Sequence, residues 1–87
     1  MMHPYKKSKT KIKSFFIENE INQCDLLWNF IEPECLKRDE LPLSRRSLSD
    51  ILHGHRSPTL LFMRQIREGL SLYLGREIDM KDVFDII

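Results

Sequence analysis

The sequence predicts an all-α protein with a single domain, and three observations support this prediction. Apolar residues recur at spacings of three and four along most of the chain, as they do in helices with one buried side. No stretch has the pattern of a credible strand, and three glycines are too few for the tight turns of an all-β chain. The 87 residues, 41% of them hydrophobic, suffice for one modest core. We therefore expect five helices.

The first two helices are predicted after a flexible basic arm at residues 1–9. Four apolar residues at helical spacing predict a first helix that ends near Asn19 or Glu20: Ile12, Phe15, Phe16 and Ile17. Asn22 can cap the second helix, with Ile21 and Leu26 forming a hydrophobic staple over its start. Pro33 should limit this helix to about Ile31 or Glu32. We interpret Trp28 and the phenylalanines as core residues.

Residues 32–43 have the least regular pattern in the chain. Their charges and two prolines predict an inserted loop, with at most a short helical turn around residues 35–39. The two cysteines, Cys24 and Cys35, fit no zinc-binding spacing, and we expect them to be reduced and to pack as small apolar residues.

A third helix is predicted after Leu43. Ser44 can cap it, and Leu48, Ile51 and Leu52 form its narrow apolar stripe. Gly54 should end it in a left-handed conformation. A second register remains open, in which Ser47 is the cap and the two arginines before it lie just outside the helix.

The last two helices follow a loop that contains Pro58. The fourth starts around residues 57–59 and ends at Gly75, with an apolar face made of Leu60, Met63, Ile66, Leu70, Tyr73 and Leu74. Residues 78–83 repeat the cap pattern and open a short fifth helix, with Phe84 and Ile87 on its apolar side.

Charge is distributed unevenly, although the net charge is only +1. Five lysines crowd the start: Lys6, Lys7, Lys9, Lys11 and Lys13. Arginines mark the middle, whereas carboxylates gather at the end: Glu77, Asp79, Asp82 and Asp85. A chain polarised in this way can turn a basic face to DNA. The lysine-rich arm is interpreted equally well as a solubilising tail.

The stretch from Leu43 to Phe84 carries the functional signal. Residues 43–60 read LSRRSLSDILHGHRSPTL, residues 22–27 read NQCDLL, and residues 78–84 read IDMKDVF. In this order the three pieces resemble the Cro/C1 (XRE) helix-turn-helix family of phage repressors and bacterial regulators. The resemblance implies a lambda-repressor-like fold over residues 10–87. The family joins its two motif helices by a tight turn, whereas about eleven additional residues intervene here.

The resemblance implies that the helix at about residues 45–53 reads the major groove of double-stranded DNA. Base-reading residues would be Arg45, Arg46, Ser47 and Asp50. Arginine can donate two hydrogen bonds to guanine, and Asp50 can either accept one from cytosine or orient Arg46. Phosphate contacts would come from Gln23, Ser44, His55 and Arg56. A homodimer on a palindromic operator is implied, and the apolar residues Phe84, Ile86 and Ile87 also favour it.

Other function classes receive less support. We expect no enzyme and no small-molecule substrate, because no nucleophile elbow, metalloprotease pattern or phosphate loop is present. His53 and His55 would diverge on a helix, so we expect no metal. We expect no cofactor. No apolar run reaches the roughly 20 residues of a membrane span, so we expect a cytoplasmic protein. The resemblance implies a regulator of transcription of phage or bacterial origin. RNA binding lacks a stacking motif.

One alternative function remains open, a protein-interaction module on a helix-turn-helix framework. Such a module would be an antirepressor, an antitoxin-like protein or a protein that binds a host factor. The inserted residues 32–43 and the nearly neutral net charge favour it. The surface around Arg45 and Arg46 distinguishes the two functions, because a positive and open face fits DNA.

Overall fold

The computed structural model describes residues 10–85, which form helices and no strand. The elements are α1 (Lys11–Glu18), α2 (Gln23–Leu26), the π-helix η2 (Leu27–Ile31), α3 (Glu32–Lys37), α4 (Arg45–Leu52), α5 (Leu60–Leu74) and α6 (Met80–Val83). Because α2, η2 and α3 follow one another without a break, the described chain has five helical bodies. The all-α fold of one domain is therefore confirmed. The predicted arm at residues 1–9 and the C-terminal Ile86 and Ile87 lie outside the described residues.

Side-chain caps fix where four of the helices begin. The cap oxygens of Thr10, Asn22, Ser44 and Thr59 each accept a hydrogen bond from the backbone N–H three residues further on, at 2.9–3.2 Å. These bonds satisfy N–H groups that have no partner inside the helix. The predicted caps Asn22 and Ser44 are confirmed, and the register with Ser47 as the cap is excluded. Pro58 lies before α5 rather than in its first turn.

Two glycines end helices in the left-handed conformation, as predicted. Gly54 follows α4 with φ of 79°, and Gly75 follows α5 with φ of 70°. The same conformation occurs at Glu20 after α1 and at Asp39 after α3, with φ of 54° and 56°. There the second residue after the cap donates its N–H back to the helix, Ile21 to Phe16 and Glu40 to Cys35, which completes the usual closing motif.

The second helix does not end before Pro33, which corrects the expected boundary at Ile31 or Glu32. The helix continues through η2 into α3 and ends at Lys37, so the first half of the predicted loop at residues 32–43 is helical. Proline in a helix lacks an N–H and its ring collides with the carbonyl four residues earlier. In η2 the N–H of Glu32 donates to the carbonyl oxygen of Leu27, five residues earlier. This wider turn absorbs the proline without a break.

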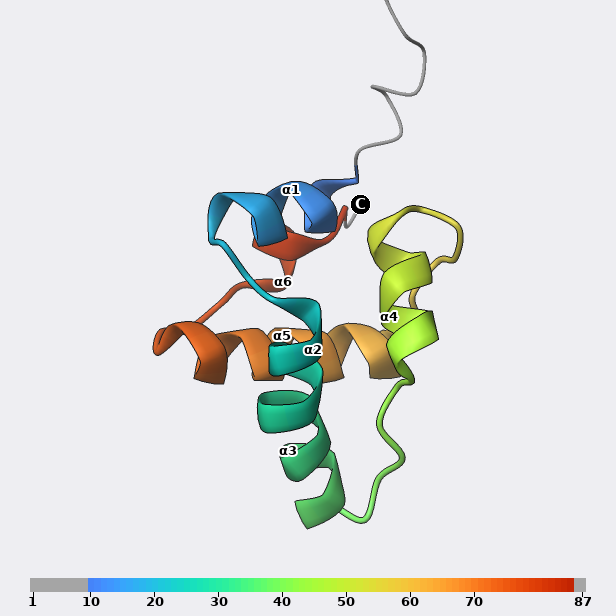
Figure 1. Cartoon of the computed structure of the whole chain (residues 1–87), viewed down its shortest axis with the longest axis vertical. Helices are drawn as coiled ribbons and strands as arrows, with labels where there is room; N and C mark the ends of the chain where they lie inside the picture. Colours follow the sequence, from blue (N-terminus) through green and yellow to red (C-terminus); the bar gives the residue numbers. More distant parts are fainter. Residues whose placement is uncertain (1–9, 86–87) are drawn as a thin grey trace, which may run out of the picture.

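The α2–α3 helix crosses α5, and Figure 1 shows it running down the view in front of α5, with α4 at the right-hand edge. Gly69 permits the close approach, because a Cβ added there would lie 2.4 Å from Cγ1 of Ile31. The short α6 packs against α1 and α5 at the other end of the molecule. No helix among the described residues has the length and apolar character of a membrane span.

The core lies between these helices and differs from prediction at a few positions. Leu26, Leu48 and Ile66 are fully buried at its centre. Trp28, predicted in the core, is 52% exposed. Leu60 and Ile17 were also expected inside and are 77% and 54% exposed, because the helices that carry them turn these residues away from their neighbours.

Phe84 is buried in this same core, at 5% exposure. An apolar C-terminus was one reason to expect a dimer, and Phe84 was part of it. Because its ring already packs inside the monomer, Phe84 gives no support to a dimer interface.

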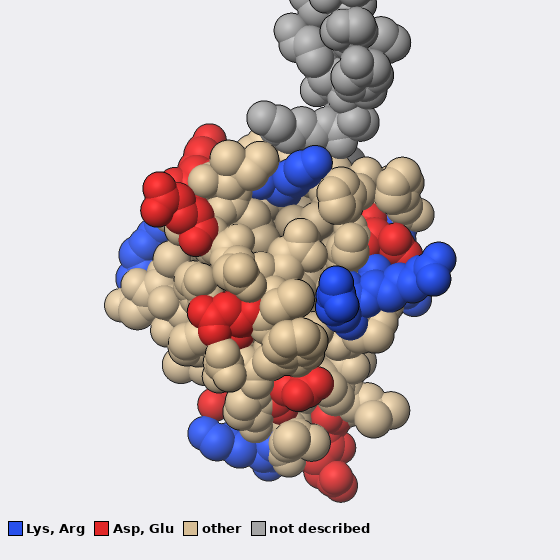
Figure 2. Space-filling view, viewed as in Figure 1, with Lys and Arg blue, Asp and Glu red and all other residues tan. Residues whose placement is uncertain are grey.

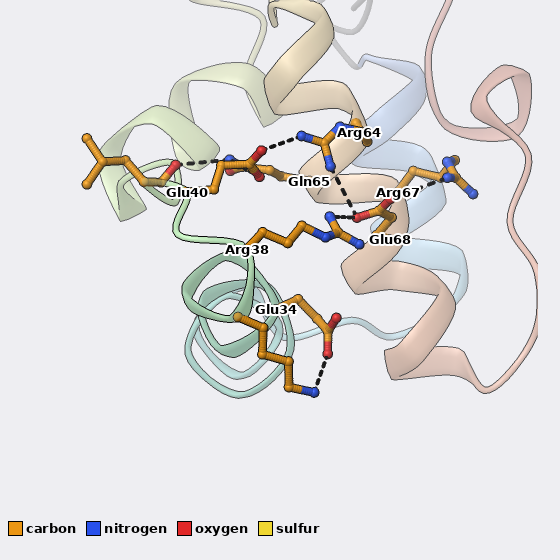
Figure 3. Close-up of polar contacts among 9 residues, drawn as sticks. Glu34, Arg38, Glu40, Arg64, Gln65, Arg67 and Glu68 are labelled. Carbon is orange, nitrogen blue, oxygen red and sulfur yellow. Dashed lines mark hydrogen bonds and ion pairs between the residues drawn. The ribbon is translucent and has the colours of Figure 1, made fainter.

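A polar network ties residues 38–43 to α5, as Figure 3 shows. Arg38 pairs with Glu68, and Glu40 pairs with Arg64. The hydrogen bond from Arg64 holds the pKa of the Glu40 carboxyl below its ordinary value. Gln65, only 2% exposed, accepts from the N–H of Leu43 at 3.0 Å and donates to the carbonyl oxygen of residue 41 at 3.0 Å. The segment is therefore held in place by five side chains.

The two cysteines are free thiols, but they differ in exposure. Cys35 is buried in the core at 2% exposure, whereas Cys24 is half-buried. Burial raises the pKa of the Cys35 thiol, with a smaller contribution from the nearby carboxylate of Glu40. The thiol of Cys35 is therefore neutral near pH 7 and packs as a small apolar side chain.

Candidate nucleic-acid interface

Helix α4 has one buried and one open side. Leu48, Ile51 and Leu52 are at most 3% exposed and face the core. Leu43 just before the helix is also buried and is anchored to Gln65, so the start of α4 is fixed on α5. The opposite side of α4 lies at the edge of the fold in Figure 1. A helix held in this way presents a rigid outer surface.

Arg45 and Arg46 occupy the first turn of this outer surface and are exposed. Neither side chain has a hydrogen-bond or ion-pair partner among residues 10–85. The five other arginines of the chain all have such a partner, on Glu68, Ser47, Glu40, Ile78 or Asn19. Figure 2 shows the resulting basic side chains projecting from the molecule over α4. Two adjacent guanidinium groups are thus left available to an outside ligand.

Asp50 lies one turn further along the same side, together with Ser49. Arg45, Arg46, Ser49 and Asp50 line one shallow hollow on the surface. No ion pair joins Asp50 to Arg46 among the described residues, so the alternative in which Asp50 orients Arg46 is not realised by direct contact. Ser49 was not predicted as a site residue, although its spacing of four from Arg45 places the two on one side of a helix.

Ser47 does not face outward, which corrects its predicted role as a base reader. The residue is only 7% exposed. Its Oγ accepts hydrogen bonds from the guanidinium of Arg56 at 2.6 Å and from Oγ of Ser44 at 3.1 Å. Ser47 therefore links the start of α4 to the loop that follows it. Ser47 is buried because this loop folds back beside the first turn of the helix.

Arg56 and His55 lie in that loop, which leaves the C-terminal end of α4 and returns beside its first turn. The Arg56 guanidinium donates to Ser47 and stands 5.7 Å from the ring centre of Phe62, a cation–π contact. It still has N–H groups to donate, because the guanidinium carries five. The exposed ring of His55 stacks on His53 at 6.3 Å between ring centres. His53 was not predicted as a site residue, and its ring is fixed by a 2.9 Å contact between Nδ1 and the carbonyl oxygen of Ser49.

The two remaining predicted phosphate contacts, Ser44 and Gln23, differ in how free they are. The Ser44 hydroxyl is occupied, since it accepts from the N–H of Ser47 and donates to Oγ of the same residue. Gln23 is the first residue of α2, a helix that packs against α4, and its side chain has no hydrogen bond within residues 10–85. The structure therefore brings together Arg45, Arg46 and Asp50, and places Gln23 and the loop at the margins.

No group of His, Cys, Asp and Glu side chains within the described part of the chain is arranged to hold a metal ion. No protein-family model, curated protein or solved structure matches this chain. The likeness to Cro/C1 regulators therefore rests on the motif residues at positions 22–27, 43–60 and 78–84 alone.

Proposed function

We propose that this chain is a sequence-specific double-stranded DNA-binding regulator of transcription, a repressor, that reads the major groove with α4. One observation carries the proposal: Arg45 and Arg46 are exposed and unpaired within residues 10–85, at the start of a helix with an open outer side. An α-helix with its side chains is about 10–12 Å across, which suits a groove about 12 Å wide.

The two arginines supply the base contacts in this mechanism. Each guanidinium donates two parallel hydrogen bonds to O6 and N7 of a guanine, and each good pair discriminates against other bases by about 1–3 kcal/mol. Asp50 accepts from N4 of a cytosine one turn further along. Ser47 contributes indirectly, because its buried hydroxyl holds Arg56 beside the helix start.

Phosphate contacts would fix the register of the helix in the groove. Gln23 on α2 is free to donate from one side of α4, His55 from the loop that follows the helix, and Arg56 from beside the helix start, where Ser47 holds it. Ser44 can donate to a phosphate only by giving up its bond to Ser47. The homodimer that the family resemblance implies belongs to the proposal, and its two-fold axis would place half-sites about 34 Å apart.

Binding to DNA with the double variant Arg45→Ala, Arg46→Ala tests the proposal. The wild type should bind random duplex DNA in a salt-sensitive way and then select preferred sites from a random pool. The double variant should lose that preference, with affinity for the selected site falling by about tenfold or more, since each arginine contributes about 1 kcal/mol or more of discrimination.

A matched control removes the same charge elsewhere. Lys37 at the end of α3 and Arg76 after α5 are both exposed, so Lys37→Ala, Arg76→Ala lowers the net charge equally without touching α4. This variant should keep the site preference. If both double variants lost the site preference equally, the effect would be one of net charge and not of α4. A folded wild type that binds no DNA at low salt would refute the proposal.

A further inference from the structure

The outer side of the α2–α3 helix carries large apolar side chains that the fold does not cover. Trp28 is 52% exposed and Leu36 is 69% exposed. With Glu32 between them they follow a spacing of four, which places all three in one row along the helix. The core side of the same helix is filled by Leu27, Ile31 and Cys35.

Carboxylates outnumber basic groups along the segment that carries this row. Residues 23–41 contain five acidic and only two basic residues. Both basic residues are occupied, Lys37 by Glu34 at 3.0 Å and Arg38 by Glu68. Glu32 and Asp39 have no ion pair with any described residue. Glu32 lies within the row and Asp39 follows Leu36 by three residues, so two carboxylates without an ion pair among residues 10–85 accompany the exposed apolar side chains.

Figure 2 shows several acidic side chains over the α2–α3 helix, a basic group at the lower end of α3 and another basic group at the edge over α4. DNA carries one negative charge per phosphate and is repelled by these acidic side chains. The proposed DNA contact through α4 therefore leaves the α2–α3 row uncovered and without a function.

We propose that this outer face of α2–α3, centred on Trp28, Glu32 and Leu36, docks a positively charged amphipathic helix of another protein. Exposed apolar groups rimmed by charge mark contact surfaces, and tryptophan is enriched among residues that dominate binding. The carboxylates select the partner, because lysine or arginine at the margins of an apolar stripe would pair with Glu32 and Asp39. This function goes beyond DNA binding and uses other residues.

Trp28 itself reports on the contact, because it is the only tryptophan of the chain. A short amphipathic peptide of leucine and lysine is titrated into the full chain, and tryptophan emission is followed. We expect a saturable blue shift as the indole leaves water. The same peptide with glutamate in place of lysine, and one with serine in place of leucine, should produce no shift.

Variants locate the binding surface. Leu36→Ser should weaken peptide binding by about tenfold, because the contact then lacks one buried leucine side chain. The double variant Glu32→Gln, Asp39→Asn should weaken peptide binding to a similar degree. Leu60→Ser is the matched control, since Leu60 is 77% exposed and begins α5, and this variant should bind the peptide as the wild type does. All these positions are on the surface, so the variants should fold.

Three outcomes would overturn the proposal. Emission that does not respond to the cationic peptide would do so, as would equal responses to the cationic and acidic peptides. A blue shift that grows with protein concentration alone, together with a dimer in sedimentation, would assign the face to a second copy of this chain. The variant Arg45→Ala, Arg46→Ala should still bind the peptide, so a failure of DNA binding is distinguishable from a failure of docking.

Discussion

At Gly69 the lack of a side chain sets how closely α5 approaches the α2–α3 helix. A Cβ at this position would lie 2.4 Å from Cγ1 and 3.3 Å from Cδ1 of Ile31, and the isoleucine is buried and has no room to retreat. Overpacking a core costs about 1–3 kcal/mol, whereas alanine gains up to about 1 kcal/mol over glycine in a helix. We expect Gly69→Ala to lower the free energy of unfolding by about 1 kcal/mol in urea denaturation.

A double-mutant cycle separates the two effects. In the background of Ile31→Ala the clash is gone, so Gly69→Ala should now stabilise the protein through helix propensity alone. A Gly69→Ala change that has the same sign in both backgrounds would contradict the steric explanation.

Neighbouring residues in α4 show what sequence can and cannot predict at this scale. The spacing of apolar residues correctly predicted that Leu48, Ile51 and Leu52 face inward and that Arg45 and Arg46 do not. The burial of Ser47 could not be predicted from this spacing, because it depends on Arg56, nine residues away, which folds back onto the Ser47 hydroxyl. Trp28 was misjudged for a related reason, since an aromatic residue next to apolar neighbours says nothing about which side the core lies on.

The inserted segment at residues 38–43 owes its conformation to α5 and above all to Gln65. That side chain satisfies the buried N–H of Leu43 and the carbonyl oxygen of residue 41. Gln65→Leu keeps the volume and leaves both groups without a partner, at a cost of about 1–3 kcal/mol for an unsatisfied buried group. We expect this loss in urea denaturation, together with faster hydrogen exchange at the Leu43 amide.

Gln65→Glu tests whether the acceptor is what matters. At pH 7 it retains an oxygen for the Leu43 N–H but loses the donor and faces Glu40. The Leu43 amide should stay protected in this variant although stability falls. An equally fast exchange in both variants would show that volume or charge, not the acceptor, protects the amide.

The ion pair of Glu40 with Arg64 should make the anchoring of this segment dependent on pH. The hydrogen bond from Arg64 lowers the pKa of the Glu40 carboxyl in the folded state, relative to an ordinary value of about 4.5. A depressed pKa means that the stabilisation is complete above the ordinary value and is lost as the pH falls through the folded-state value. Urea denaturation from pH 7 to pH 3 should therefore show the wild type losing more stability than Glu40→Gln, and parallel curves would contradict this.

The boundaries of the elements were predictable where a side chain makes them locally. Asn22 and Ser44 indicate helix starts, because their side chains accept hydrogen bonds from N–H groups of the first turn. Gly54 indicates a helix end, because glycine readily adopts the left-handed conformation. The prediction from Pro33 was wrong, because the chain accommodates the proline with a π turn at Leu27–Ile31, which the α-helical spacing of the sequence does not indicate. Asp39 follows α3 in the left-handed conformation, which aspartate adopts more readily than most residues other than glycine.

Across the whole molecule, charged residues make up 31% of the chain, but the two signs nearly cancel. A net charge of +1 gives no general attraction to nucleic acid, so within residues 10–85 the proposed attraction to DNA rests on the local group over α4. Residues 23–41, in contrast, contain five acidic and two basic residues. The outer sides of α4 and of α2–α3 belong to one folded unit, because both helices pack on the same core. The relative positions of these two surfaces are therefore fixed.

The salt dependence of DNA binding should divide the basic residues by role. Each phosphate contact adds about 0.9 to the slope of log K against log salt concentration, whereas base contacts govern site preference. Arg56→Gln keeps a donor for Ser47 and removes the charge, so it should lower the slope by about 0.9 and leave the preferred site unchanged. Arg45→Ala, Arg46→Ala should instead erase the preference. If Arg56→Gln changed the preferred site, or if the arginine pair changed only the slope, the roles assigned to the helix and to its loop would be reversed.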